Sequence, residues 1–474
     1  MIAGLLLFLV LPLVVGSAVY VLRRWRLASA LVSVGMALAL GLGIVLLPLG
    51  QTVEIWGRQI VMGGRLSFLG RELILEEKDR VAIAFLYLTT SGLFLLGWRV
   101  SPRNLLFPVG FGVLSLLSGS LLIRPLIYAV LLVEIAIAIS VFALRAEGGR
   151  TGRGALQYLS FSLLAMPGLL VIHWLMDRYR LTPDNTALLD TAAVLLSLSF
   201  ALLLGSVPFH TWIPALGDDS EPLASAFVLT VNYGAIWFLL LGYLETYPDL
   251  TGYARFASIT SGAGVAMVSV GGLLAACQNR FGRLMGYGAL MDSGVSLIAL
   301  GMSSDRGLAL VVLSLLVRPF GLGLMAVGLR GFRARRGHDL RSASVRGLGR
   351  RAAWSTFAFV TGGLSAAGLP ISAGFAGRWS LYRALGTSRL APALTVMAAS
   401  VGLMVGVWRA LHALLAADEL LVETETEAEE GAERWPSGIA VLLAVVASAV
   451  VGLAPQLLAP TAARVAGMYT FLAP

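Results

Sequence analysis

The chain contains about fourteen runs of apolar residues, each long enough to form a helix that crosses a membrane. A spanning helix needs roughly 20 predominantly apolar residues. The runs lie near residues 2–22, 27–49, 81–98, 105–122, 125–144, 156–176, 187–207, 223–244, 256–277, 285–302, 306–329, 354–380, 390–408 and 437–459. A strand barrel would show alternating segments of about ten residues instead. We therefore predict an all-α polytopic membrane protein.

The composition excludes a water-soluble enzyme. Charged residues make up 13% of the 474 residues, hydrophobic residues 58%, and the mean hydropathy is +0.85, so polar side chains are too few to cover a soluble body. Cys277 is the single cysteine, which leaves no set of ligands for an iron–sulfur cluster and no CxxCH haem attachment. The sequence has no P-loop and no GxGxxG motif. We expect no metal, no cofactor and no catalytic site on this chain.

Basic residues number 35, of which one is Lys78 and the other 34 are arginines. Most lie in loops between apolar runs, which is the pattern of cytoplasmic loops rather than of a nucleic-acid surface. If the loop after the first run is cytoplasmic, that side of the membrane holds 20 basic residues and the other side 14. This threading predicts that both termini lie on the outer side.

Two loops differ from the rest. Residues 50–80 alternate apolar and polar side chains around several glycines, and we predict a small β-hairpin there, on the outer face. Residues 418–434 form an acidic run on the inner side, which is either a solvated loop or a docking patch for a partner protein.

Two ionisable residues of the first half stand within or beside apolar runs. Glu134 has no basic residue within ten positions. It is either an acid that carries a proton or a neutral side chain bonded to a neighbouring helix, because an unpaired carboxylate in hydrocarbon is costly. His210 lies between Pro208 and Pro214, which break a helix. It either exchanges a proton near neutral pH or satisfies backbone groups freed at the break.

Three charged residues of the second half also lie within or beside apolar runs. Asp292 and Arg318 belong to successive apolar runs and can pair, either as a functional site or as a purely structural ion pair. Arg378 ends a run that Pro370 and several glycines interrupt. Broken helices form ion sites in transporters, so Arg378 either contributes to such a site or extends to the membrane surface.

Three stretches carry a resemblance to a known family. VPFHTWIPAL with EPLASAFVLTVNYGAI, QNRFGRLMGYGALMDSG, and RGLGRRAAWSTFAFVTGGLSAAGLPISAGFAGRW resemble motifs of the antiporter-like membrane subunits of complex I, Mrp-type cation/proton antiporters and membrane-bound hydrogenases. The resemblance covers roughly residues 75–415 and is closest to the N-type subunit of bacterial NADH:quinone oxidoreductase.

The resemblance implies a fold of two inverted five-helix repeats with broken seventh and twelfth helices. It divides the chain into N-terminal helices with the hairpin loop (1–104), a first antiporter-like half (105–245), a second half (246–415), and the acidic loop with a C-terminal helix (416–474). It also implies a bacterial cytoplasmic membrane, partner membrane subunits, and flavin, iron–sulfur clusters and quinone on those partners.

The family's mid-membrane polar axis carries over only in part. Glu134 matches the acid of the fifth helix, whereas its seventh-helix lysine falls at Leu203 and its eighth-helix lysine at Tyr233. The later basic positions of the axis fall at three charged residues, namely Asp292, Arg318 and Arg378. Arginine keeps its proton where lysine can release one, so the resemblance implies a modified axis in which Glu134 has lost its cationic partner.

Three functions follow as hypotheses. The chain is a subunit of a complex I-like oxidoreductase that takes part in proton translocation through Glu134, His210, Asp292, Arg318 and Arg378. Alternatively, it is a non-pumping structural subunit of such a complex, as the losses at Leu203 and Tyr233 favour. A third possibility is a subunit of an Mrp-type antiporter or of a membrane-bound hydrogenase.

Overall fold

The computed structural model describes residues 2–46, 52–55, 58–61, 65–68, 70–98, 105–145, 152–252, 255–386, 389–416 and 435–471. Each of the fourteen predicted spans coincides with a helix or with a pair of shorter helices, which confirms an all-α membrane fold. Within the described residues, nine helices are long and apolar enough to cross a membrane, and three shorter ones are also apolar. The acidic run 418–434 lies outside the described residues.

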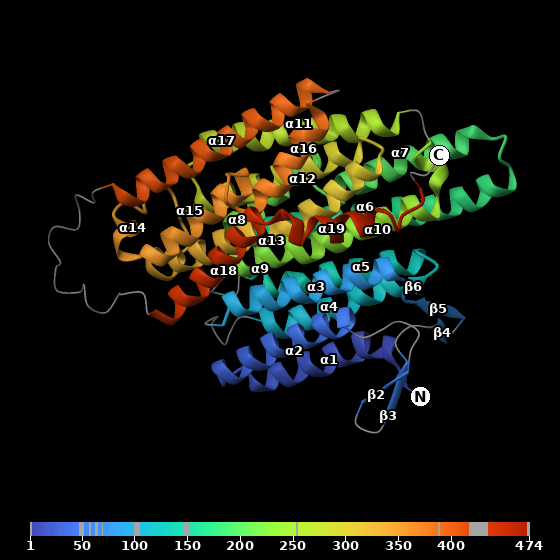
Figure 1. Cartoon of the computed structure of the whole chain (residues 1–474), viewed down its shortest axis with the longest axis horizontal. Helices are drawn as coiled ribbons and strands as arrows, with labels where there is room; N and C mark the ends of the chain where they lie inside the picture. The colour runs from blue at the N-terminus through green and yellow to red at the C-terminus, as the bar shows by residue number, and fades with distance from the viewer. Residues whose placement is uncertain are drawn as a thin grey trace.

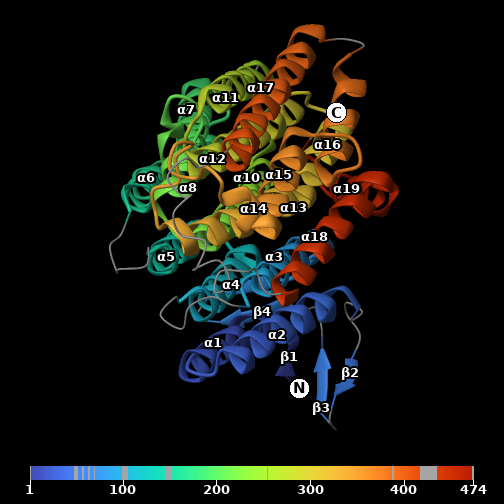
Figure 2. The same cartoon turned by 90° about the vertical axis from the view of Figure 1, so that its left-hand side faces the viewer.

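Three helices form one side of the bundle, as Figure 2 shows for the first two of them. They are α1 (Gly4–Leu22), α2 (Arg26–Leu46) and α3 (Glu77–Leu96). The sequence predicts one hairpin in residues 50–80, but the structure has two. β2 (Thr52–Ile55) pairs with β3 (Arg58–Val61), and β4 (Arg65–Phe68) pairs with β5 (Arg71–Ile74). The short strands β1 (Ile2–Ala3) and β6 (Ile123–Arg124) complete two three-stranded sheets.

The family resemblance assigns five spans to a first repeat. It comprises α4 (Leu106–Leu122), α5 (Ile127–Ala143), α6 (Arg153–Leu181), α7 (Thr186–Leu203) with η1 (Phe209–Thr211) and α8 (Trp212–Asp219), and α9 (Pro222–Phe227) with η2 (Val228–Asn232) and α10 (Tyr233–Thr246). The most apolar part of the α9–α10 span is buried throughout. Polar residues in that part of the span are therefore shielded from both lipid and water.

The break in the seventh span has a local cause. Gly205 adopts a φ of +62°, a left-handed conformation that ends α7, and a Cβ atom there would lie 2.6 Å from the Ile213 side chain. Pro208 cannot donate the backbone hydrogen bond that would continue the helix. The carbonyl groups at the end of α7 consequently need partners outside their own helix.

The second repeat has a matching break in its fourth span. It comprises α11 (Phe256–Cys277), α12 (Phe281–Leu300), α13 (Asp305–Arg336), the short α14 (Leu348–Arg351), α15 (Ala353–Ala367) with α16 (Ala373–Leu385), and α17 (Leu390–Leu415). Gly368 ends α15 with a φ of +81°, and a Cβ atom there would lie 2.4 Å from the Arg378 side chain. Glycine is thus required for Arg378 to lie against the break.

The last three described elements are α18 (Trp435–Leu453), η6 (Pro455–Leu457) and α19 (Ala459–Ala466). Figure 1 places both ends of the chain at the end of the bundle opposite α14, which agrees with an even number of spans. The α14 end also holds the Arg-rich segment 330–351.

Candidate functional site

A line of buried polar side chains runs between the two broken spans, and its centre is the carboxylate of Asp292 on α12. Asp292 Oδ2 lies 3.5 Å from Arg318 Nη1, and Asp292 Oδ1 lies 3.8 Å from Arg378 Nη2. Both arginine side chains are almost completely buried, while that of Asp292 is 18% exposed. The pair that the sequence suggests between Asp292 and Arg318 is therefore present, and Arg378 joins it to form a cluster of three charges.

Arg318 ties the cluster to the central span. Its Nε atom donates to the carbonyl oxygen of Leu229 at 2.7 Å, and its Nη1 atom donates to Ser293 Oγ at 3.0 Å. Leu229 belongs to η2, a single turn of π-helix, a local widening that often accompanies functional sites. The guanidinium group also lies over the Tyr233 ring, 4.2 Å from its centroid, in the arrangement of a cation–π contact.

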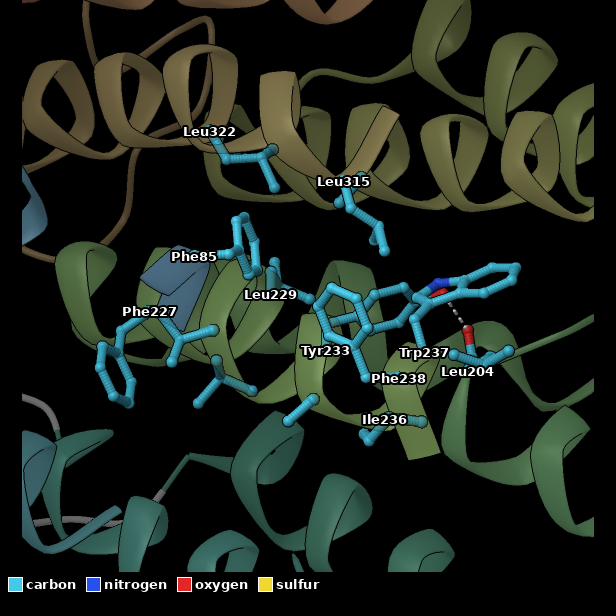
Figure 3. Packing of buried hydrophobic residues seen from close by; sticks show 14 of the residues in the cluster. Phe85, Leu204, Phe227, Leu229, Tyr233, Ile236, Trp237, Phe238, Leu315 and Leu322 are labelled. Carbon is cyan, nitrogen blue, oxygen red and sulfur yellow. Dashed lines mark hydrogen bonds between the residues drawn. The ribbon is translucent and has the colours of Figure 1, made fainter. Parts of the chain in front are cut away.

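Tyr233 connects this cluster to the broken seventh span. Its hydroxyl donates a hydrogen bond to the carbonyl oxygen of Leu204 at 2.9 Å (Figure 3). Leu204 directly follows α7, so no helix continues beyond it to satisfy that oxygen. Tyr233, at the position where the family resemblance expects a lysine, therefore stabilises the break with a neutral group.

Arg378 occupies the end of the other broken span. Its Nη2 atom donates to the carbonyl oxygen of Ala366 at 3.0 Å, close to the C-terminal end of α15. A positive charge there is stabilised by the helix dipole and by the unsatisfied carbonyl groups. The alternative in which Arg378 extends to the membrane surface is wrong, because the residue is only 2% exposed and contacts Asp292.

Glu134 lies apart from these charges. It is half-buried on α5, and its Oε1 atom accepts a hydrogen bond from Ser162 Oγ of α6 at 3.2 Å. Within the described part of the chain, no basic side chain forms an ion pair with it. Leu203 is buried at the end of α7 and offers no polar group. The two repeats therefore differ in the partner of the acid on their second helix. In the first repeat Glu134 faces Ser162, whereas in the second repeat Asp292 faces Arg318.

A second polar cluster lies between Glu134 and the central span. Asn232 Nδ2 donates to Ser140 Oγ at 2.8 Å and to the Tyr158 hydroxyl at 3.3 Å. Asn232 immediately precedes Tyr233, and Tyr158 lies within electrostatic range of Glu134. Sequence reasoning missed Ser140, Tyr158 and Ser162, since single hydroxyl groups in apolar helices have no recognisable pattern. In the sequence, only Asn232, an amide within an apolar run, indicated that polar partners lie nearby.

His210 lies in η1, beyond the break of the seventh span. Its Nδ1 atom is buried and has no hydrogen-bond partner among the described residues. The structure does not bring its ring into contact with Glu134 or Asp292, as far as the described residues show. Among those same residues, no group of three His, Cys, Asp or Glu side chains is arranged to hold a metal ion.

A multi-pass helical bundle with two broken spans and a buried line of charge between them defines an antiporter-like membrane subunit. The chain belongs to the family described as NADH:quinone oxidoreductase/Mrp antiporter, TM, whose model matches residues 149–406, more than half of its length.

Two relatives and two solved structures illustrate the similarity. Subunit N of the NADH-quinone oxidoreductase of Rhodococcus opacus is 30% identical over 206 residues, which cover 43% of this chain and 37% of the relative. Subunit N of Cereibacter sphaeroides is 27% identical over 454 residues, or 92% of each chain. The fold is similar to a chain of the Mrp complex of a Dietzia species (TM-score 0.80, 16% identity, covering 98% of this chain and 97% of that one). It is also similar to a chain of respiratory complex I from Thermus thermophilus (TM-score 0.75, 19% identity, covering 99% and 100%).

Proposed function

We propose that the chain is the N-type membrane subunit of a complex I-like NADH:quinone oxidoreductase, and that it takes part in proton translocation coupled to electron transport. The position of Asp292 between Arg318 and Arg378 carries the proposal. An ionisable residue buried among apolar helices is costly and is retained where it has a function. Family membership and the likeness to subunit N chains support the kind of complex.

Asp292 acts as a movable charge between two fixed ones. Arginine stays protonated in proteins, so Arg318 and Arg378 hold constant positive charge. Both distances from Asp292, 3.5 and 3.8 Å, exceed the 2.7–2.9 Å of a close charge-assisted hydrogen bond. A small displacement brings the carboxylate into full contact with one guanidinium and away from the other. Such a displacement changes the electric field at the neighbouring groups and thereby transmits a charge change from an adjacent subunit.

Glu134 and His210 are the proposed proton-exchanging groups of the first half, because carboxyl and imidazole side chains can bind and release protons where arginine cannot. The route from Glu134 towards the second half passes Tyr158 and Asn232, whose side chains are hydrogen-bonded to each other. Ser162 replaces a cation as the partner of Glu134. The first half is therefore a rebuilt version of the axis that the family resemblance implies.

We assign the redox groups of the complex to its other subunits. Electron transfer from NADH to quinone requires flavin and iron–sulfur clusters, and we assign these groups and the quinone site to partner subunits. We place the chain in a bacterial cytoplasmic membrane with both termini on the outer side. This orientation puts the Arg-rich segment 330–351 in the cytoplasm, in keeping with the positive-inside rule.

The test is reconstitution of the whole complex in vesicles with Glu134→Gln, followed by measurement of protons translocated per electron. We expect a lower ratio with assembly and quinone reduction retained. Glu245→Gln is the matched control, because the Glu245 carboxylate accepts hydrogen bonds from the backbone of Thr470 and Phe471 at the end of the bundle. An unchanged ratio in Glu134→Gln would remove that residue from the proposal.

A non-pumping structural subunit is the second candidate. Leu203 and Tyr233 favour it, since neither can carry the charge of the lysines expected there, and Tyr233 closes the break of the seventh span. In that case the double variant Asp292→Asn/Arg318→Gln would lower the yield of assembled complex but leave the protons per electron unchanged. Loss of pumping in an intact double-variant complex would exclude this candidate.

A further inference from the structure

The Arg-rich end of the bundle contains a cavity that is separate from the line of charge at the centre. It is a cavity of about 570 Å³ at the end of α17, where the α11–α12 turn meets the segment after α13. Its polar and aromatic lining residues are Asn279, Arg341, Arg346, Trp408, Arg409 and His412. Among the described residues that line it, none is acidic. Three guanidinium groups thus face a single hollow.

The walls of this cavity are fixed by backbone hydrogen bonds. Ser342 N donates to the carbonyl oxygen of Asn279 at 2.9 Å, and Phe281 N donates to that of Leu340 at 3.1 Å. Val345 and Leu340 anchor the same segment in the core, since both are buried. The segment that carries Arg341 and Arg346 is therefore held against the α11–α12 turn rather than free in solvent.

The three arginines keep most of their binding capacity. Arg409 donates to the carbonyl oxygen of Ala276 at 2.6 Å and to Asn279 Oδ1 at 2.8 Å, which orients it without neutralising it. Arg341 pairs with the exposed Asp339 at 2.9 Å. Arg346 forms no ion pair with any described residue. An anion that enters this cavity therefore meets a net positive charge from the described lining residues.

The apolar face of α17 leads directly into the cavity. Leu394, Met397, Val401, Val405 and Trp408 are all exposed, by 43–68%, and their spacing of three or four residues places them on one side of the helix. α17 is among the helices long enough to cross a membrane. Trp408 stands at the point where this stripe reaches the basic cavity, the position that tryptophan favours at a membrane–water interface.

We propose that this cavity binds the phosphate group of an anionic phospholipid, whose acyl chains lie along the exposed face of α17. Charge complementarity selects the headgroup, because arginine binds phosphate oxygens through paired N–H donors. The continuous apolar stripe selects a lipid over a free phosphate ion. Basic pockets at helix ends are suited to such headgroups.

The test is native mass spectrometry of the full chain, titrated with phosphatidylglycerol and with phosphatidylcholine of the same acyl chains. We expect tighter binding of phosphatidylglycerol, and binding roughly fivefold weaker in Arg346→Gln, the loss expected for one basic group at an anionic lipid. Arg346 is exposed and forms no hydrogen bond or ion pair with any described residue, so its removal leaves folding intact. Arg350→Gln is the control, because Arg350 is exposed on α14 at the same end but does not line the cavity.

Two further arms separate the lipid from a free anion. Trp408→Ala should weaken phosphatidylglycerol binding, and millimolar inorganic phosphate should fail to displace the lipid. Equal binding of the two lipids, an equal loss in Arg350→Gln, or full displacement by inorganic phosphate would each overturn the proposal.

Discussion

Asp292 and Arg378 face each other between an unbroken helix and a broken one, with Asp292 Oδ1 3.8 Å from Arg378 Nη2. Arg378 also donates to the carbonyl oxygen of Ala366 near the end of α15, while Arg318 approaches the other oxygen of Asp292. One carboxylate therefore balances two buried cations that belong to different spans. A change at Asp292 acts on both spans at once.

Asp292→Asn should destabilise the chain by about 3 kcal/mol, at the low end of the cost of breaking a buried ion pair. The substitution leaves Arg318 and Arg378 buried without a counter-charge. Thermal unfolding of the purified chain in detergent measures the effect. The double variant Asp292→Asn/Arg378→Gln should recover part of the loss, because it removes one of the stranded cations.

The control for this prediction is Asp305→Asn, which removes an exposed aspartate at the start of α13. Its unfolding midpoint should stay close to that of the unaltered chain. If Asp292→Asn shifts the midpoint no more than this control does, the three charges do not stabilise the fold as described.

Tyr233→Phe should destabilise the chain by about 1–3 kcal/mol, the cost of leaving a buried carbonyl without its donor. The ring stays over Arg318, so the loss reports on the hydroxyl group that donates to Leu204 and not on the cation–π contact. Tyr243→Phe is a close control, since Tyr243 is equally buried and donates to the carbonyl of Leu169 within the unbroken helix α6. Equal losses in the two variants would mean that the break has no special need of Tyr233.

Ser162→Ala should alter the vibrational spectrum of Glu134. Glu134 lacks the cationic partner that the family resemblance leads us to expect, so we predict that it is neutral. Ser162 donates a hydrogen bond to its Oε1 atom. Infrared spectroscopy should show a carboxylic acid C=O band that moves to higher wavenumber in Ser162→Ala and vanishes in Glu134→Gln.

Ser160→Ala serves as the control, since Ser160 is exposed and bonds to its own helix at Leu156. A carboxylate band in place of a carboxylic acid band would show that Glu134 is ionised and that its missing partner has been replaced from elsewhere.

Hydropathy alone predicted the spans, because a spanning helix needs a run of apolar residues whatever its neighbours are. Pro208 and Pro370 likewise predicted the two breaks, since proline cannot continue a helix. The partners of the charged residues were harder to predict. Asp292 and Arg318 are on successive helices, but Arg378 reaches Asp292 only because Gly368 leaves room for its side chain.

The first half was less predictable still. Ser162 is one of many serines that bond to their own helices, and nothing in the sequence distinguishes it as the one that also faces Glu134. Tyr233 was recognised as a lost lysine, but its hydrogen bond to Leu204 depends on where the chain turns after α7. Tertiary contacts of this kind depend on helix rotation and depth, which a hydropathy pattern leaves open.

The central claim is that Asp292 transmits charge changes through the chain during proton translocation. The most direct measurement is the number of protons translocated per electron by vesicles that hold fully assembled complexes with Asp292→Asn, with subunit content verified beforehand. We predict a lower ratio at a retained rate of quinone reduction, and recovery of the ratio in Asp292→Glu. An unchanged ratio in intact Asp292→Asn complexes would contradict the claim.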